Sequence, residues 1–381
     1  MQPAEYIVHV DTRLQQESTR CERFFERQSK KEVMTVVQEE LIANVSETIV
    51  SGAFNNLVKE NDTESLRTLY RLLSLVNQVD IMHSAWSDYI KVRIHMNVTD
   101  RQTFGVEMVR HPERDEEMIP ALLSFKAHLD SVLRNSFNSD ETFSAYLRES
   151  FEWVINRRRD KPAEYTAKYL DNILRKGDKG LASGESSVEE EMDRVLVLFR
   201  FVHGKDVFEA FYKKDLAKRL LLAKSASADA ERSMLTKLKN GTPFSFPSMA
   251  AATHHVFGRL LIGAECGAQF TQKLEGMFKD IDVSQDFMKS FKEQRHATQI
   301  ERNLHVNVLS QSWWPTYPEK NVILPESMVN ALESFKEFWL KKQSGRKLMW
   351  RHALGHCILS ADFPKVPHVT FTFSKSREER N

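Results

Sequence analysis

Histidine and cysteine side chains gather near the C-terminal end of the sequence. His352 and His356 are four residues apart, and Cys357 follows directly. On a helix, two histidines at this spacing share a face and could bind zinc. However, Gly355 interrupts any helix here, and strand-like sequence surrounds the cluster. We therefore predict no metal site, and we expect these histidines to lie in the core or on the surface.

Two other motifs fail as reaction centres. Gly204 and Lys205 suggest a phosphate-binding loop, but that loop needs a glycine five residues before Gly204 and a hydroxyl side chain after the lysine. Phe199 and Asp206 stand there instead. Cys266 lies between a glutamate and a glycine, which supply neither a base nor a positive setting for a thiolate. We predict no catalytic residue and no cofactor.

A positively charged stretch is the remaining chemical feature. Between Lys205 and Lys239 the sequence holds nine lysines and arginines against five acidic residues. Such an excess can form a docking surface for an acidic partner, acting mainly on the rate of encounter, or simply a solvated helix face. Both interpretations stay open. The partner-binding candidates on this stretch are Lys213, Lys214, Lys218 and Arg219.

Amphipathic helices must position these side chains. In the first 160 residues, apolar residues recur every three or four positions, as at Leu66, Leu69 and Leu73. Phe208, Tyr212, Leu216 and Leu220 repeat at four-residue spacing and predict a buried helix face. Asp206 resembles the start of a capping box for that helix, and Ser227 can cap the next one.

The last eighty residues mix helix and strand patterns. Leu304, Val306 and Val308 alternate with polar residues, a period of two that predicts a strand. Pro325 predicts the start of a helix that stops near Gly345. Further short strands are expected at 346–350 and 356–361.

Composition restricts the class of protein. The 381 residues carry a formal net charge of +1, with 41% apolar and 28% charged residues. A near-zero charge argues against a nucleic-acid coat or a polybasic membrane anchor. No stretch of about 18 apolar residues predicts a membrane span. Three cysteines without a CxxC pair indicate a reducing compartment.

Long ordered motifs resemble the cullin family. They include HGKDVFEAFYKKDLAKRLL from His203 to Leu221, KLEGMFKD from Lys273 to Asp280, and WPTY from Trp314 to Tyr317. The sequences of these motifs are most similar to those of the fourth cullin subtype. The resemblance covers nearly all of residues 1–363, except an atypical segment at 240–264 that carries a single charged residue.

The resemblance implies a mainly α protein: cullin-repeat helical bundles, then a helical bundle and a partial α/β domain. It implies a non-catalytic scaffold of a cullin-RING ubiquitin ligase in the cytoplasm and nucleus. The implied partners are a DDB-type β-propeller substrate adaptor, a RING-box protein and a ubiquitin-conjugating enzyme, with no membrane and no direct nucleic acid. Leu348 and Trp350 are candidate contacts of the RING-box strand, and the basic helix would attract an acidic enzyme tail.

The same resemblance predicts the domain limits. Residues 1–45 would end one cullin repeat, 46–160 would form another, and 161–300 a helical bundle with the atypical insert. Residues 301–381 would form a partial α/β domain with an aberrant tail, and the insert and tail suggest a retained intron or a gene-model error. We expect this chain alone not to support ubiquitin transfer. The alternatives are a helical-repeat binding scaffold without a role in ubiquitination and a non-functional truncated fragment.

Overall fold

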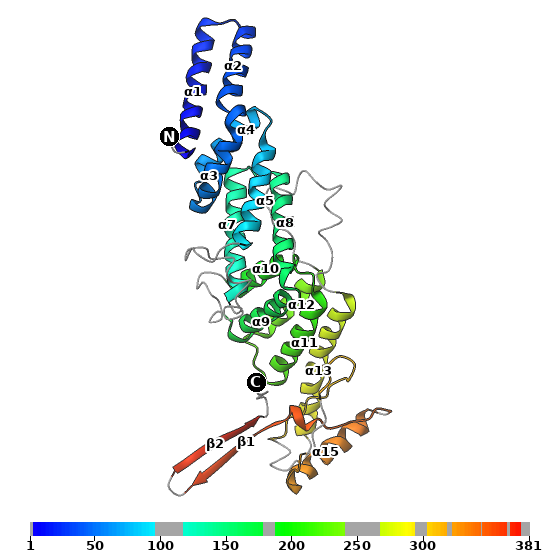
Figure 1. Cartoon of the computed structure of the whole chain (residues 1–381). Helices are drawn as coiled ribbons and strands as arrows, with labels where there is room; N and C mark the ends of the chain where they lie inside the picture. The colour runs from blue at the N-terminus through cyan, green and yellow to red at the C-terminus, as the bar shows by residue number, and fades with distance from the viewer. Residues whose placement is uncertain are drawn as a thin grey trace. The chain divides into compact units, whose positions relative to one another are not determined.

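Helices make up most of the described chain (Figure 1). The computed structural model describes residues 3–95, 117–177, 187–240, 267–293, 303–317, 322–343, 345–363 and 366–374. The prediction of a mainly α protein is confirmed. Within the described part, no helix combines the length and apolar character that a membrane span requires.

The chain divides into two units. Unit 1 comprises residues 1–170 and 181–208, and unit 2 comprises 171–180 and 209–381, so the division falls within helices α9 and α11. The helices that begin in unit 1 are α1 (Pro3–Phe24), α2 (Arg27–Leu41), α3 (Ser46–Glu60), α4 (Thr63–Leu75), α5 (Val79–His95), α7 (Met118–Ser136), α8 (Glu141–Ile155), α9 (Lys161–Lys176), α10 (Val188–Phe199) and α11 (Lys205–Leu221). Unit 2 adds α12 (Ala228–Asn240), α13 (Ala268–Lys292), α15 (Glu326–Lys342), β1 (His356–Phe363) and β2 (Val366–Ser374).

Side-chain caps start several helices of unit 1. The Asp62 carboxylate accepts a hydrogen bond from the Ser65 backbone N–H at the start of α4. Asp140 does the same for Thr142 at the start of α8. Ser187 begins α10 with a reciprocal capping box. Because each cap satisfies a backbone donor that the helix leaves unpaired, these polar residues determine where the helices begin.

An aromatic cluster forms the centre of the α3–α8 bundle. The rings of Phe137 and Phe143 stack with centroids 4.2 Å apart, and Trp86 meets Phe137 edge-on at 5.5 Å. The Trp86 indole N–H donates to the Phe143 carbonyl at 3.3 Å, which satisfies the polar end of this buried ring. The predicted apolar face of α4 is buried here as well.

Helix α11 begins two residues earlier than the capping motif suggests, because a cap at Asp206 would make Val207 the first helical residue. Because α11 starts at Lys205, Asp206 lies in its first turn and is not its cap. The prediction for the next helix is confirmed, since the Ser227 hydroxyl accepts from the Ala230 backbone N–H at 3.3 Å. Tyr212 and Leu216 are fully buried, and Leu220 is half-buried, so most of the predicted α11 face is core.

Segment 304–310 corrects the strand predicted from its two-residue period. It has no strand assignment, and its alternate backbone N–H groups donate to side chains of α13. Two extended residues advance about 6.6 Å and four helical residues about 6 Å, so the repeats match. The three pairs are Val306 with Met288 Sδ (3.3 Å), Val308 with Ser284 Oγ (2.8 Å) and Ser310 with Asp280 Oδ2 (2.7 Å).

The following turn packs tightly on the same helix. A Cβ atom placed on Gly276 of α13 would lie 1.9 Å from the Trp313 ring, so only glycine allows this contact. The Trp314 indole N–H donates to Asp280 Oδ2 at 2.9 Å. The carboxylate of Asp280 thus joins both the segment and the turn to α13.

The two strands form an antiparallel hairpin, with Leu359 opposite Phe371. The strand expected at 356–361 is confirmed, whereas the described residues at 346–350 form none. Strand β2 lies in the C-terminal segment that we predicted to be an aberrant tail. The helix predicted from Pro325 is also confirmed, because Pro325 is the residue before α15.

Candidate partner-binding surfaces

The four candidate cations of α11 are only partly exposed. We call Lys213, Lys214, Lys218 and Arg219 the basic stripe. Lys214 and Lys218 are exposed on α11, and the Lys218 ammonium lies 3.6 Å from the Asp215 carboxylate. Lys213 is half-buried. Burial lowers the pKa of Lys213, and the positive charge of Lys273 lowers it further. An anion placed beside these two lysines would therefore be stabilised electrostatically.

Arg219 does not belong to this surface, which corrects the prediction. Its side chain is 1% exposed and makes hydrogen bonds of 2.5 and 3.0 Å to Glu231 of α12. A further bond of 2.6 Å reaches Asp171 in α9. Burial alone would lower the pKa of Arg219, but Glu231 and Asp171 outweigh it and raise this pKa. Arg219 is thus an internal connection between three helices.

Lys273 is the residue that the sequence analysis missed. It lies on α13, sixty residues after Lys213, and is exposed. The rings of Tyr212 and Phe270 meet edge-on with centroids 6.4 Å apart, so α11 and α13 pack together beside this pair. No local spacing could have indicated the proximity, because it arises from packing between helices that are distant in sequence.

Leu348 and Trp350 cover a hydrophobic cluster. Both are half-buried against a core that is centred on α13 and α15. The Trp350 ring lies 6.2 Å from the Phe335 ring, centroid to centroid. Met349, between them, is 52% exposed. The two candidates therefore support the local core, and their role in partner binding stays a prediction.

The β1–β2 hairpin offers backbone hydrogen-bonding groups. Among the residues that the structure describes, β1 and β2 pair only with each other, so each keeps one edge without a ladder. The pairing shifts register between Ala361 and Phe363, near the turn. An unpaired edge can accept a strand from another chain.

His352 and His356 do not lie on one α-helix. A short 3-10 turn covers His352–Leu354, Gly355 follows, and His356 begins β1. Across the described part of the chain, no group of three histidine, cysteine, aspartate or glutamate side chains is placed to hold a metal ion.

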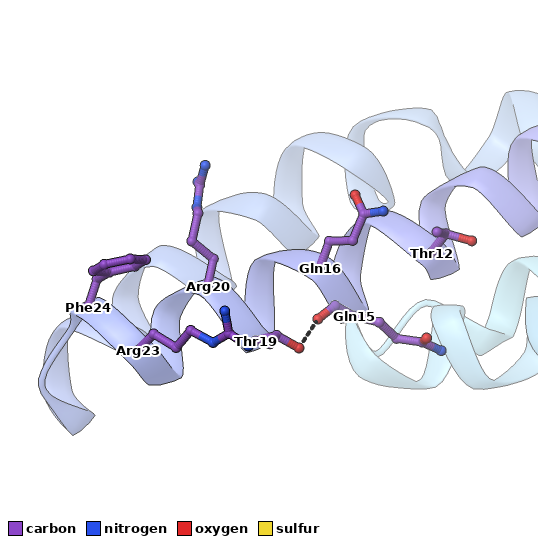
Figure 2. A pocket seen from close by; sticks show the side chains of 7 residues that line it. All are labelled: Thr12, Gln15, Gln16, Thr19, Arg20, Arg23 and Phe24. Carbon is purple, nitrogen blue, oxygen red and sulfur yellow. Dashed lines mark hydrogen bonds between the residues drawn. The ribbon is translucent and has the colours of Figure 1, made fainter.

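A shallow depression on α1 is shown in Figure 2. Its lining comes from one helix whose lining residues mostly have polar side chains, and the Thr19 hydroxyl donates to the Gln15 carbonyl within it. Small-molecule sites usually enclose their ligand with apolar walls and converging polar groups, which one helix face does not provide. The lining residues are Thr12, Gln15, Gln16, Thr19, Arg20, Arg23 and Phe24.

Comparison with known proteins agrees with the helical arm and the mixed C-terminal part. The Cullin alpha solenoid domain matches residues 1–249 and 261–288, and the Cullin alpha+beta domain matches residues 308–377. Cullin-4A of Mus musculus is 42% identical over 364 residues, which is 94% of this chain and 43% of the relative. Cullin-4 of Dictyostelium discoideum is 38% identical, covering 94% and 40%, and Cullin-3 of the same organism is 32% identical, covering 96% and 44%.

The chain spans less than half the length of these relatives. The expected likeness to the fourth cullin subtype is confirmed by the two Cullin-4 matches. Because both domain matches follow the order of the two described regions and the first covers more than half of the residues, the chain belongs to the cullin family.

Proposed function

We propose that this chain acts as a scaffold in a cullin-RING ubiquitin ligase, where it positions a RING-box protein relative to a substrate adaptor. The observation that carries the proposal is the family membership, extending over 94% of the chain. A scaffold contributes by fixing distance and orientation, which raises the effective concentration of the reacting groups. Stacked helical bundles suit this role because they resist bending.

The β1–β2 hairpin is the element that we propose for holding the RING-box protein. An added strand needs a neighbour that is already paired, because a lone strand offers neither a fixed edge nor a formed face. The expectation that this chain alone does not support ubiquitin transfer stays a prediction. Because β2 already pairs with β1, the hairpin provides an edge for strand addition, and we expect the chain to form a complex with the RING-box protein.

Co-expression with a RING-box protein tests the proposal. The full chain should elute with it as a one-to-one complex in size-exclusion chromatography. A variant with Ser360→Pro and Thr370→Pro should lose the complex, because these residues face each other in the ladder and proline removes the N–H donor.

A matched variant separates this effect from general misfolding. Pro162 and Pro325 already lie at helix starts, so changing them to alanine alters proline content without touching the hairpin. This control should keep the complex. Failure of the unaltered chain to bind the RING-box protein would contradict the proposal, as would binding that survives both proline substitutions in the hairpin.

A further inference from the structure

Two turns of unit 1 lie side by side: the turn between α8 and α9, and the turn between α10 and α11. The Asn156 side chain connects them. Its amide N–H donates to the Phe201 carbonyl at 2.7 Å, and its amide oxygen accepts from the His203 backbone N–H at 2.8 Å. The His203 ring Nε2 also lies 2.6 Å from the Glu152 carboxylate, so the Asn156 amide and this side-chain pair together hold the two turns.

Positive charge concentrates at this place. From residue 152 to residue 161 there are four lysines and arginines and two acidic residues, a local net charge of +2 against +1 for the whole chain. Most of these cations are exposed. We define the basic corner as Trp153, Arg157, Arg158, Arg159 and Lys161.

An exposed aromatic ring adjoins these charges. Trp153 is 44% exposed, and the Arg157 guanidinium lies 4.3 Å from the centroid of its ring. The stacked pair presents a flat apolar surface next to donors that match a carboxylate in shape. Tryptophan and arginine are the residues most enriched among those that dominate binding energy at protein interfaces.

The backbone at Arg159 gives a second and independent indication. Arg159 has φ 44° and ψ −110°, a conformation that glycine adopts easily and other residues rarely adopt. Glycine would relieve this strain, so the fold itself does not favour an arginine here. Strain of this kind concentrates at binding sites, where the side chain has a use outside the fold.

We propose that the basic corner binds an acidic segment of a partner protein. This interaction goes beyond the scaffold role and shares no residue with the α11 lysines. The charge favours a peptide over a nucleic acid, because the excess is confined to one short turn and the chain as a whole is nearly neutral. Exposed carboxylates would pair with the arginine forks while an apolar neighbour rests on Trp153.

Fluorescence anisotropy with a labelled glutamate-rich peptide of ten residues tests the proposal on the full chain. All measurements use a background with Lys213→Gln, Lys214→Gln and Lys218→Gln, so that a second acidic-peptide site on α11 cannot contribute. Changing Arg157, Arg159 and Lys161 to glutamate should weaken binding about tenfold or more at low salt. The matched control changes Arg13, Arg23 and Lys31 to glutamate as well. These are three exposed cations of the same unit, and the change should weaken binding about twofold at most.

Arg159→Gly separates a binding role from a structural one. It should raise the melting temperature, because it relieves the strained backbone, and it should weaken peptide binding at the same time. Equal losses in the corner variant and the control would overturn the proposal, as would unchanged binding in Arg159→Gly. Tighter binding of a single-stranded oligonucleotide of equal charge, with the same sensitivity to the variants, would also overturn it, because the partner would then be a nucleic acid.

Discussion

Single residues in unit 2 divide into those that are exposed to solvent and those that hold the fold. Lys214 and Arg219 are both cations of α11, yet Lys214 is exposed and Arg219 is 1% exposed. The difference arises because Arg219 meets Glu231 and Asp171, which neutralise it inside the protein. A buried charge without such partners would carry a large desolvation cost.

Arg219→Met should therefore destabilise the chain by about 3–5 kcal/mol, because Glu231 would keep a buried charge without its partner. Lys218→Met, the matched control on the same helix, should cost less than about 1 kcal/mol, since the Lys218 side chain is 52% exposed and its ammonium lies 3.6 Å from the Asp215 carboxylate. Urea denaturation followed by circular dichroism measures both changes. Equal losses in the two variants would show that the Arg219 network is not buried in solution.

Whole elements are positioned by contacts between residues that are distant from each other in the sequence. The segment 304–310 would need a neighbouring strand to satisfy its backbone if it were part of a sheet. Here the side chains of α13 supply one acceptor per turn, and every second backbone N–H of the segment donates a hydrogen bond to one of them. Because the two repeats have nearly equal length, a helix takes the place of a strand as the partner.

Ser284→Ala tests this arrangement at its centre. The substitution removes the oxygen that accepts from the Val308 N–H at 2.8 Å and leaves that donor without its acceptor on α13. We expect a loss of about 1–3 kcal/mol and faster amide exchange at Val308. Gln285→Ala changes an exposed neighbour and should leave both quantities unchanged. Unaltered exchange at Val308 in Ser284→Ala would contradict the proposed docking.

At the scale of the whole molecule, the family match covers nearly the entire chain but is interrupted between residues 249 and 261. This interruption falls within the atypical segment 240–264, of which all residues except Asn240 lie outside the described ranges. The domain limits predicted from the sequence likewise stay predictions. The interruption nevertheless supports treating the segment as separable from the helical core.

Deleting residues 241–264 should leave the melting temperature unchanged or higher. Long insertions between two helices cost little entropy, and their removal costs correspondingly little. As a control, deleting an equal length from α13 should abolish folding, because that helix carries buried residues along its length. Loss of soluble protein after the first deletion would show that the segment contributes to the core.

The basic stripe predicts how salt affects assembly. Charge reversal at Lys214 and Lys218 should slow association with the acidic tail of a ubiquitin-conjugating enzyme, and the effect should fade as ionic strength rises. Stopped-flow association rates at several salt concentrations measure this. Arg67→Glu and Arg71→Glu in unit 1 provide an equal change of charge elsewhere. A defect that persists at high salt would indicate misfolding and not lost steering.

Local patterns in the sequence were sufficient for the amphipathic helices, the Ser227 cap and the family. The α11 face at Tyr212 and Leu216 and the Ser227 cap depend on neighbours within a few residues, so periodicity and side-chain chemistry predicted them. The motifs that resemble cullins are equally local. The strand at 356–361 was also predicted, and it coincides with a true ladder.

Only the tertiary structure decided which polar groups meet across the chain. It placed Arg219 inside with Glu231 and Asp171, brought Lys273 beside Lys213, and paired segment 304–310 with α13. The spacing of residues in the sequence indicates on which face of its own helix a side chain lies. It does not indicate which other element packs against that face. Burial and pairing of a charge depend on that second element, which is why the same helix carries both a surface cation and an internal one.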